Sequence, residues 1–512
     1  MLDMGGRSIQ DEGMKAIAKL IHENDSVTTL NLENTSFGSG GLKVLVEEGL
    51  QYNSSITELN LRNNILIRKE GMRLLAADVL QHNSVIRVLD LGEISFGCEG
   101  MKVLAEEGLQ YNSSITSLNL EGNEIGCEGV KALSLSLQHN SSITELNLRN
   151  NEILEQGMKV LVEEGLQYNS SIISLNLGSN YVKGEGMKVL AKYLQHTSSL
   201  MDLNLVNNDL KMEGMKLLAE GLQHNCSIVF LDLGSNDIRD EGIHWLAKGL
   251  QHNNNSSITF LDLNNNNIQR EGMKWLAELL QHNSSITSLQ LQDNNIRNFG
   301  LNELVVGLQH NSSITSLNLC HTSIGSKGMK AVARWLQYNS SITSLNLGYN
   351  NIRSEGVKLL AEGLRQNSSI KKLNVSMNDI GDEGARVLAE LLQQNPSIIS
   401  FKLKWNGIGD EGMKALAKGL EKNIIIIALK LTENSILPNS LKSNGPLLVR
   451  NRYWNGDGSG SFVRVNNPQW AIGQKSDWNR SLTKVVLRNC NLATIPNEIY
   501  SCPQLQGLDV RY

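Results

Sequence analysis

The stretch Ser-Ser-Ile-Thr-Ser-Leu-Gln-Leu, from Ser284 to Leu291, decides the fold because its pattern recurs along most of the chain. An asparagine follows at Asn294 and a glycine at Gly300, and the next residues have apolar side chains at helical spacing. The sequence therefore predicts one unit, a short strand followed by a helix, copied many times.

The copies follow one another at a near-constant period. The first leucine position of the Leu-x-Leu pair recurs in 14 steps between Leu30 and Leu429, which is about 28.5 residues a step. A unit of this length cannot bury the apolar faces of both its strand and its helix, so each copy needs its neighbours. The sequence predicts a stack with one continuous apolar interior.

The two halves of the unit are clear in single copies. Leu118 and Leu120 alternate with Asn119, which predicts a strand with one buried face. Met215, Leu218, Ala219 and Leu222 recur at helical spacing and predict the buried stripe of an amphipathic helix.

Two further columns mark the unit. A glycine stands near the start of the predicted helix in fifteen copies, and an asparagine follows the strand in twelve of sixteen copies. A buried amide can bond the backbone groups exposed where the strand turns, so we expect a structural ladder. Ile94 lacks a polar side chain and predicts a locally different turn; the other exceptions are Arg7, Thr35 and Thr322.

The core Leu345-Asn346-Leu347-Gly348-Tyr349-Asn350, with its long helical half, resembles the ribonuclease-inhibitor-like class of leucine-rich repeats, which includes NOD-like receptors and the RanGAP family. The resemblance covers residues 1–434, about 15 repeats. It implies an α/β solenoid shaped like a horseshoe, with a parallel sheet on the concave face and helices on the convex face.

Residues after 434 change character. We expect a linker or small subdomain at 435–480, with a hairpin whose arms are 447–454 and 462–465. From Leu482 the spacing shifts to 23 residues, because Val485 and Leu487 reappear as Leu508 and Val510. Residues 481–512 resemble the start of the short repeats of Roco-type GTPase-kinases, so we expect the chain to be part of a larger intracellular signalling protein.

Composition excludes several classes. A net charge of -5 does not favour a nucleic-acid or membrane-surface binder, and no apolar run has the length of a membrane span or signal peptide. Six dispersed cysteines fit reduced thiols, and we expect a cytoplasmic protein. Common catalytic, metal and cofactor motifs are absent from the sequence, so we expect no enzyme, metal or cofactor. Histidines and tyrosines share one column near the helix ends, where we expect structural packing.

The exposed strand positions offer the candidate sites. In the earlier repeats these positions carry Glu and Asp, with Arg62 and Arg149 among them. In the later repeats they carry lysines. Phe230 and Phe260 occupy equivalent positions and should project together. A lysine cluster beside an aromatic residue has the composition of an interface anchor. The predicted partner-binding residues are Lys371, Lys372, Lys402, Lys404, Trp405, Lys430, Phe230 and Phe260.

The leading hypothesis is a noncatalytic scaffold that binds a protein partner with an acidic surface on its concave face. One alternative is a GTPase activator, as the RanGAP resemblance implies, although the acidic tail of that family and an outstanding arginine are both missing from this sequence. Another is the repeat region of a Roco protein or NOD-like receptor whose catalytic domain lies outside this chain.

Overall fold

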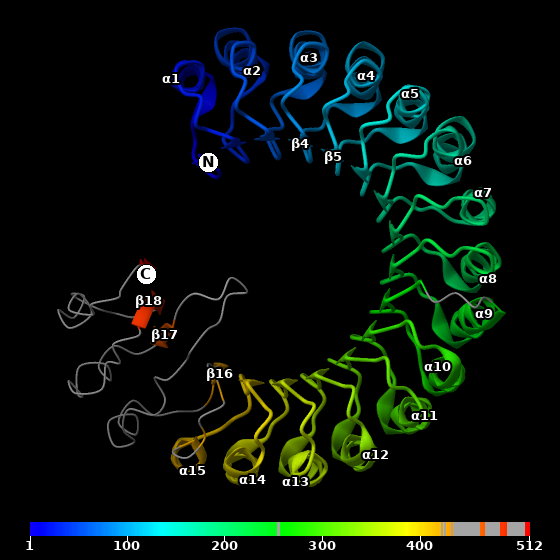
Figure 1. Cartoon of the computed structure of the whole chain (residues 1–512), viewed down its shortest axis with the longest axis vertical. Helices are drawn as coiled ribbons and strands as arrows, with labels where there is room; N and C mark the ends of the chain where they lie inside the picture. Colours follow the sequence, from blue (N-terminus) through cyan, green and yellow to red (C-terminus); the bar gives the residue numbers. More distant parts are fainter. Residues whose placement is uncertain are drawn as a thin grey trace. The chain divides into compact units, whose positions relative to one another are not determined.

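The computed structural model describes residues 1–252, 257–420, 423, 426, 428–431 and 434, and three later strands. The chain forms two compact units, Met1–Asn267 and Ile268–Tyr512. Within each unit, short strands lie along one side and helices along the other, as Figure 1 shows. The predicted α/β leucine-rich repeat solenoid is therefore confirmed as the fold class.

The described part of the first unit has ten parallel strands in sequence order, each paired with the next. The helices of its second to fourth repeats end in π-helical turns (η1–η3), and η4 is a 3-10 turn. Its elements are β1 (Leu2–Asp3), α1 (Gln10–His22), β2 (Thr29–Asn31), α2 (Ser39–Leu45), η1 (Val46–Leu50), β3 (Glu58–Asn60), α3 (Arg68–Leu74), η2 (Leu75–Leu80), β4 (Val88–Asp90), α4 (Gly97–Val103), η3 (Leu104–Leu109), β5 (Ser117–Asn119), α5 (Gly126–Leu137), β6 (Glu145–Asn147), α6 (Leu154–Glu164), η4 (Leu166–Tyr168), β7 (Ser174–Asn176), α7 (Gly184–Leu194), β8 (Asp202–Asn204), α8 (Lys211–Leu222), β9 (Phe230–Asp232), α9 (Arg239–His252) and β10 (Phe260–Asp262).

The second unit continues the same alternation, and its strands β11 to β16 pair in order. Its elements are α10 (Arg270–His282), β11 (Ser288–Gln290), α11 (Arg297–Gln309), β12 (Ser316–Asn318), α12 (Gly325–Tyr338), β13 (Ser344–Asn346), α13 (Arg353–Leu364), β14 (Lys372–Asn374), α14 (Gly381–Gln394), β15 (Ser400–Lys402), α15 (Asp410–Leu420), β16 (Ala428–Lys430), β17 (Ser461–Val465), β18 (Leu482–Arg488) and β19 (Gly507–Arg511).

The apolar columns form the core that the period predicts. Leu203 and Leu205 on and after β8 are fully buried, and so are Met215 and Leu218 on α8. Helices of neighbouring repeats approach closely because glycines line their contact. A Cβ atom at Gly363 of α13 would lie 2.5 Å from the Cα atom of Ala333 on α12, so a larger residue there would push the two helices apart.

A ladder of buried asparagines joins each repeat to the one before it. The Asn180 amide donates to the carbonyls of Leu148, in the preceding repeat, and Leu177, at 2.8 and 3.0 Å. Its Oδ1 accepts the backbone N–H of Asn151 at 2.9 Å. One side chain therefore satisfies backbone groups of two turns at once, which confirms the predicted ladder.

The turn at Ile94 is less different than its sequence predicts. Glu93 and Ser95 take the same left-handed conformation as their counterparts elsewhere, with φ values of 54° and 59°. The Ile94 N–H still bonds to Oδ1 of Asn123 at 3.0 Å, and the Leu61 carbonyl still accepts from Asn64. The prediction was wrong for the backbone, because the neighbouring asparagines hold the turn and only the amide donors and the Oδ1 acceptor that asparagine supplies elsewhere are lost at residue 94.

The C-terminal strands pair in parallel. Phe462–Val465, expected as a hairpin arm, lies in β17, which pairs in parallel with β18. Val485 pairs with Leu508 and Leu487 with Val510 between β18 and β19, and both pairs have the 23-residue offset seen in the sequence. The other hairpin arm, at 447–454, lies outside the described residues, and the boundaries proposed at 434 and 480 stay predictions.

We expect the ladder to be the main polar contribution to stability. Asn180→Val leaves the carbonyls of Leu148 and Leu177 without this donor, whereas Asn180→Thr keeps a hydroxyl that can donate to Leu177, as Thr322 does to Leu319. Urea unfolding should show a loss of about 4 kcal/mol for Val and about 2 kcal/mol for Thr. Asn207→Ser, at an exposed turn position, is the control and should cost less than either. Equal losses for Val and Thr would contradict the hydrogen-bond explanation.

Candidate functional site

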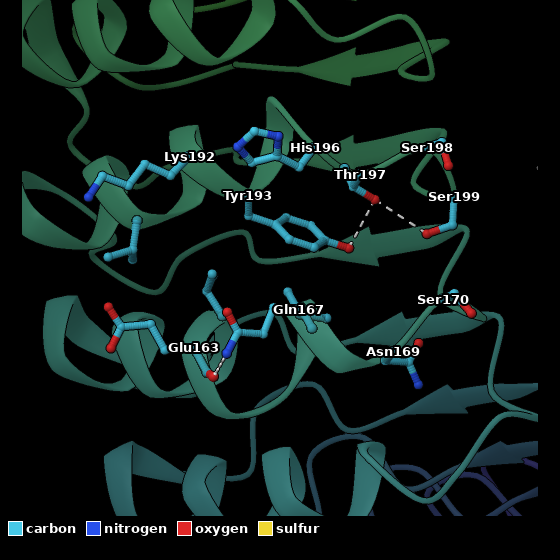
Figure 2. Close-up of a pocket in the computed structure, with 13 residues that line it drawn as sticks. Glu163, Gln167, Asn169, Ser170, Lys192, Tyr193, His196, Thr197, Ser198 and Ser199 are labelled. Atoms are coloured by element: carbon cyan, nitrogen blue, oxygen red, sulfur yellow. Dashed lines mark hydrogen bonds between the residues drawn. The ribbon is translucent and has the colours of Figure 1, made fainter.

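A crevice lies between successive repeats near the ends of α6 and α7. Its volume is about 530 Å³, and Figure 2 shows Glu163, Lys192, Tyr193 and His196 around it. Its hydroxyl groups bond to one another: Thr197 Oγ1 donates to Tyr193 Oη at 3.2 Å and lies 3.4 Å from Ser199 Oγ. Burial is the main cause that raises the pKa of Tyr193. These contacts are local to the segment from Tyr193 to Ser199 and present no nucleophile paired with a base.

The histidine and tyrosine column at the helix ends is exposed. Tyr52, Tyr111 and Tyr168 are about two-thirds exposed, and Tyr338 is 87% exposed. The described histidines of the column, such as His139 and His310, are exposed as well. The exposure of these rings contradicts the expected packing for most of the column, although Tyr52 meets the ring of His22 in the preceding repeat edge to face, with centroids 5.0 Å apart.

Charges on the strand face of the first unit are partly neutralised. Arg62 reaches Glu121, two repeats away, with Nη1 at 2.9 Å from Oε2, and Arg149 Nε lies 3.8 Å from the other oxygen of Glu121. Arg62 also pairs with Glu93 at 2.5 Å. The negative charge of Glu121 is therefore neutralised by the arginines, and the acidic character expected of this face comes from its other carboxylates.

The aromatic–carboxylate patch, which we define as Phe230, Phe260, Asp202, Asp232 and Asp262, lies on β8 to β10. Phe230 and Phe260 are register partners, and their rings stack with centroids 4.3 Å apart and planes 8° apart. Both rings are half-buried. The structure thus brings together the two phenylalanines that the sequence places at equivalent positions.

Two carboxylates stand directly beside the stacked rings. Asp232 pairs with Asp262 in the β9–β10 register, as Phe230 pairs with Phe260. Burial first, and the neighbouring Asp232 charge second, raise the pKa of Asp262 to about 6, against the lowering effect of a bond from the Asn264 N–H. Burial also raises the pKa values of Asp232 and Asp202. The patch combines an apolar surface with carboxylates that repel one another.

The two aspartates beside the rings were not among the predicted site residues. The signal was present, because Phe-Leu-Asp occurs both at 230–232 and at 260–262. Each copy places an aromatic and an acidic side chain on the same face of the strand, since they are two residues apart. The doubled tripeptide predicts the patch once the copies are known to be neighbours.

The lysine cluster, which we define as Lys371, Lys372, Lys402, Lys404 and Lys430, lies on and beside β14 to β16. Lys402 and Lys430 are register partners on adjacent strands. In the described part of the chain, no ion pair joins Lys372, Lys402 or Lys404 to an acidic side chain. The structure therefore brings the predicted lysines together on neighbouring strands.

The pKa of Lys402, on the middle strand of the cluster, is lowered by its surroundings. Burial lowers the pKa of Lys402, and the nearby charges of Lys430 and Lys372 lower it further. Trp405 follows Lys404 directly and is 55% exposed. An exposed aromatic side chain beside unneutralised lysines presents both apolar surface and positive charge to a partner.

Other kinds of site find little support in the described residues. No group of three or more His, Cys, Asp or Glu side chains there is placed to hold a metal ion. Among those same residues, no helix combines the length and apolar character needed to cross a membrane. The described cysteines, Cys98, Cys127, Cys226 and Cys320, are free thiols.

The repeated pattern is matched by a known family. The family model described as Leucine Rich repeat matches eleven segments, at residues 52–76, 111–134, 139–162, 168–191, 224–244, 254–277, 282–305, 310–333, 338–361, 366–389 and 394–417. A search of curated proteins finds no match.

Solved structures of other proteins are similar in fold. The complex of TLR13 with ssRNA13 is 18% identical, with a TM-score of 0.53, over 95% of this chain and 74% of that chain. The Rad7 and Elc1 complex of yeast is 17% identical, with a TM-score of 0.45, over 72% and 89%. LegL7 from Legionella pneumophila is 21% identical, with a TM-score of 0.37, over 58% and 86%. At these identities, the TLR13 likeness shows the fold alone.

The raised pKa of Asp262 predicts a pH-dependent effect on stability. The folded state holds the Asp262 proton up to about pH 6, and the unfolded chain releases it near the ordinary value of 3.8, so this group destabilises the fold increasingly as pH rises between those values. Asp262→Asn, which installs the residue found at Asn176 and Asn204, should raise the urea midpoint at pH 7.5 more than at pH 5.

Asp237→Asn is the matched control for this experiment. A bond from Arg239 lowers the pKa of Asp237, so its charge favours the folded state. The control should give no gain at pH 7.5. A pH-independent effect of Asp262→Asn would contradict the assigned titration.

Proposed function

Because this chain belongs to the leucine-rich repeat family, we propose that it is a noncatalytic scaffold that binds a protein partner on the exposed face of its strands. The lysine cluster carries the proposal. Three successive strands each contribute one lysine, Lys372, Lys402 and Lys430, to the same face of the sheet. A single partner can therefore contact all three. The proposed partner has an acidic surface.

The repulsion between these lysines supports the same proposal. A protein gains nothing in stability from three like charges on adjacent strands: after burial, which is the main cause, the charges of Lys430 and Lys372 also lower the pKa of Lys402. An acidic partner would remove the repulsion and would also be attracted over long range. A net charge of -5 for the whole chain favours a protein partner over nucleic acid.

We further propose that the repeats are of the ribonuclease-inhibitor-like type and belong to a larger cytoplasmic signalling protein. The long helices support the repeat type: α12 and α14 each span 14 residues within a repeat. The free thiols of Cys98 and Cys127, in equivalent positions of neighbouring repeats, support a reducing compartment. A Roco-type or NOD-like-receptor catalytic domain outside this chain is compatible with this proposal.

Charge reversal tests the lysine cluster. The whole chain is used as bait in cell lysate, captured proteins are identified, and the association rate of the main one is measured at low and high salt. Lys372→Glu with Lys404→Glu should slow association about ten-fold at low salt and flatten its salt dependence, because the long-range attraction is lost.

A control variant separates this effect from net charge. Lys327→Glu with Lys330→Glu changes the charge by the same amount on exposed positions of α12 and should leave association near the wild-type rate. Equal slowing by both variants would remove the assignment to the cluster. Capture of nucleic acid in place of protein would overturn the proposed partner class.

A further inference from the structure

One turn position after each strand has a left-handed backbone throughout the repeats. It lies two residues beyond the second leucine position, and its φ values fall between 52° and 67° at the fourteen described positions from Asn34 to Trp405. Glycine and residues with short polar side chains, asparagine and aspartate above all, tolerate this conformation best. The first ten positions follow that preference: Asn34, Asn63, Glu93, Gly122, Asn150, Ser179, Asn207, Ser235, Asn265 and Asp293.

After β12 the same column changes to large side chains. His321, Tyr349, Met377 and Trp405 occupy it in four successive repeats, with φ values of 54°, 58°, 57° and 55°. Tyr349, Met377 and Trp405 are 48%, 43% and 55% exposed. A large side chain in a left-handed conformation costs about 1 kcal/mol more than asparagine, and about half of each of these three residues stays exposed to solvent.

The four side chains form a continuous row, which we call the turn ridge. The Tyr349 N–H bonds to the Ser376 carbonyl at 2.9 Å, and the Met377 N–H bonds to the Lys404 carbonyl at 2.8 Å, so successive turns stack at the spacing of the strands. The rings of His321 and Tyr349 meet edge to face, with centroids 4.4 Å apart. His321 is also anchored to the Asp293 carboxylate.

The turn ridge borders the lysine cluster. Trp405 follows Lys404 in the chain, and Lys402 lies two residues before Lys404, on β15. The backbone bond from Met377 to Lys404 places the previous ridge position beside the same lysine. Apolar surface and positive charge therefore alternate over a short distance on the same edge of the second unit.

We propose that the turn ridge and the lysine cluster form one docking surface for an acidic segment of a partner protein that also carries large apolar side chains. This inference rests on the proposed function and adds the chemistry of the partner. The lysines fit carboxylates, and the exposed sides of Tyr349, Met377 and Trp405 fit apolar anchors between them. Single-stranded nucleic acid fits less well, because Met377, at the centre of the row, offers no ring on which a base can stack.

Two synthetic peptides of equal length and charge test the proposal with the full chain. One alternates Glu with Leu and Phe, and the other alternates Glu with Ser; fluorescence anisotropy measures both. The apolar acidic peptide should bind about ten-fold more tightly, because it can use the ridge. Tyr349→Asn, Met377→Asn and Trp405→Asn combined should remove that advantage while leaving the weak binding of the Glu-Ser peptide unchanged.

Stability measurements distinguish a binding role from a structural one. The triple variant installs asparagine, which five of the first ten turns carry and which tolerates this conformation better, so its urea midpoint should equal or exceed that of the wild type. Leu154→Asn is the matched control, because Leu154 is also left-handed, with φ 59°, and 51% exposed, but lies in another column of the first unit. The control should equal or exceed the wild type in midpoint and leave peptide binding unchanged.

Each other outcome has a defined meaning. If both peptides bind equally and Lys372→Glu with Lys404→Glu abolishes both, the ridge proposal fails and the lysine cluster stands. If Lys372→Glu with Lys404→Glu changes the affinity of neither peptide, the proposed function fails at this surface. A lower urea midpoint for the triple variant would make the ridge structural, and tighter binding of a single-stranded oligonucleotide of the same charge would overturn the protein partner.

Discussion

The buried asparagine amide after each strand is the interaction on which the repeats depend. Strands β2 to β16 are only three residues long, and the chain then enters left-handed turns that leave carbonyls and N–H groups facing the apolar interior. Asn180 bonds groups from its own turn and from the preceding one. Without such a side chain, stacking apolar repeats would leave these backbone groups buried and unsatisfied.

The ladder also limits where function can vary. Its asparagines and the leucine columns are fixed by the interior, and the glycines by the close approach of helices. The positions free to change are those on the exposed strand face and in the turns, and each repeat supplies one side chain to each column. A binding surface is therefore assembled one residue per repeat, as Phe230 and Phe260 are joined in one patch and Lys402 and Lys430 in another.

The aromatic–carboxylate patch and the lysine cluster each place like charges side by side, which destabilises the folded chain. The neighbouring charge of Asp232 adds to burial in raising the pKa of Asp262, and neighbouring lysines add to burial in lowering that of Lys402. The turn ridge adds backbone strain of the same order. A partner of complementary charge with apolar side chains would relieve the repulsion and cover the exposed rings.

The sequence by itself determined the repeat, the strand and helix halves, the asparagine ladder and the pairing of Phe230 with Phe260. These follow from periodicity, which places equivalent residues of neighbouring copies side by side. Only the tertiary structure decided the pairing of Arg62 with Glu121 two repeats away, the exposure of the tyrosine column, and the left-handed ridge at Tyr349, Met377 and Trp405. Side-chain reach, solvent exposure and the sign of φ depend on how the copies stack. They cannot be predicted from the pattern of residue types alone.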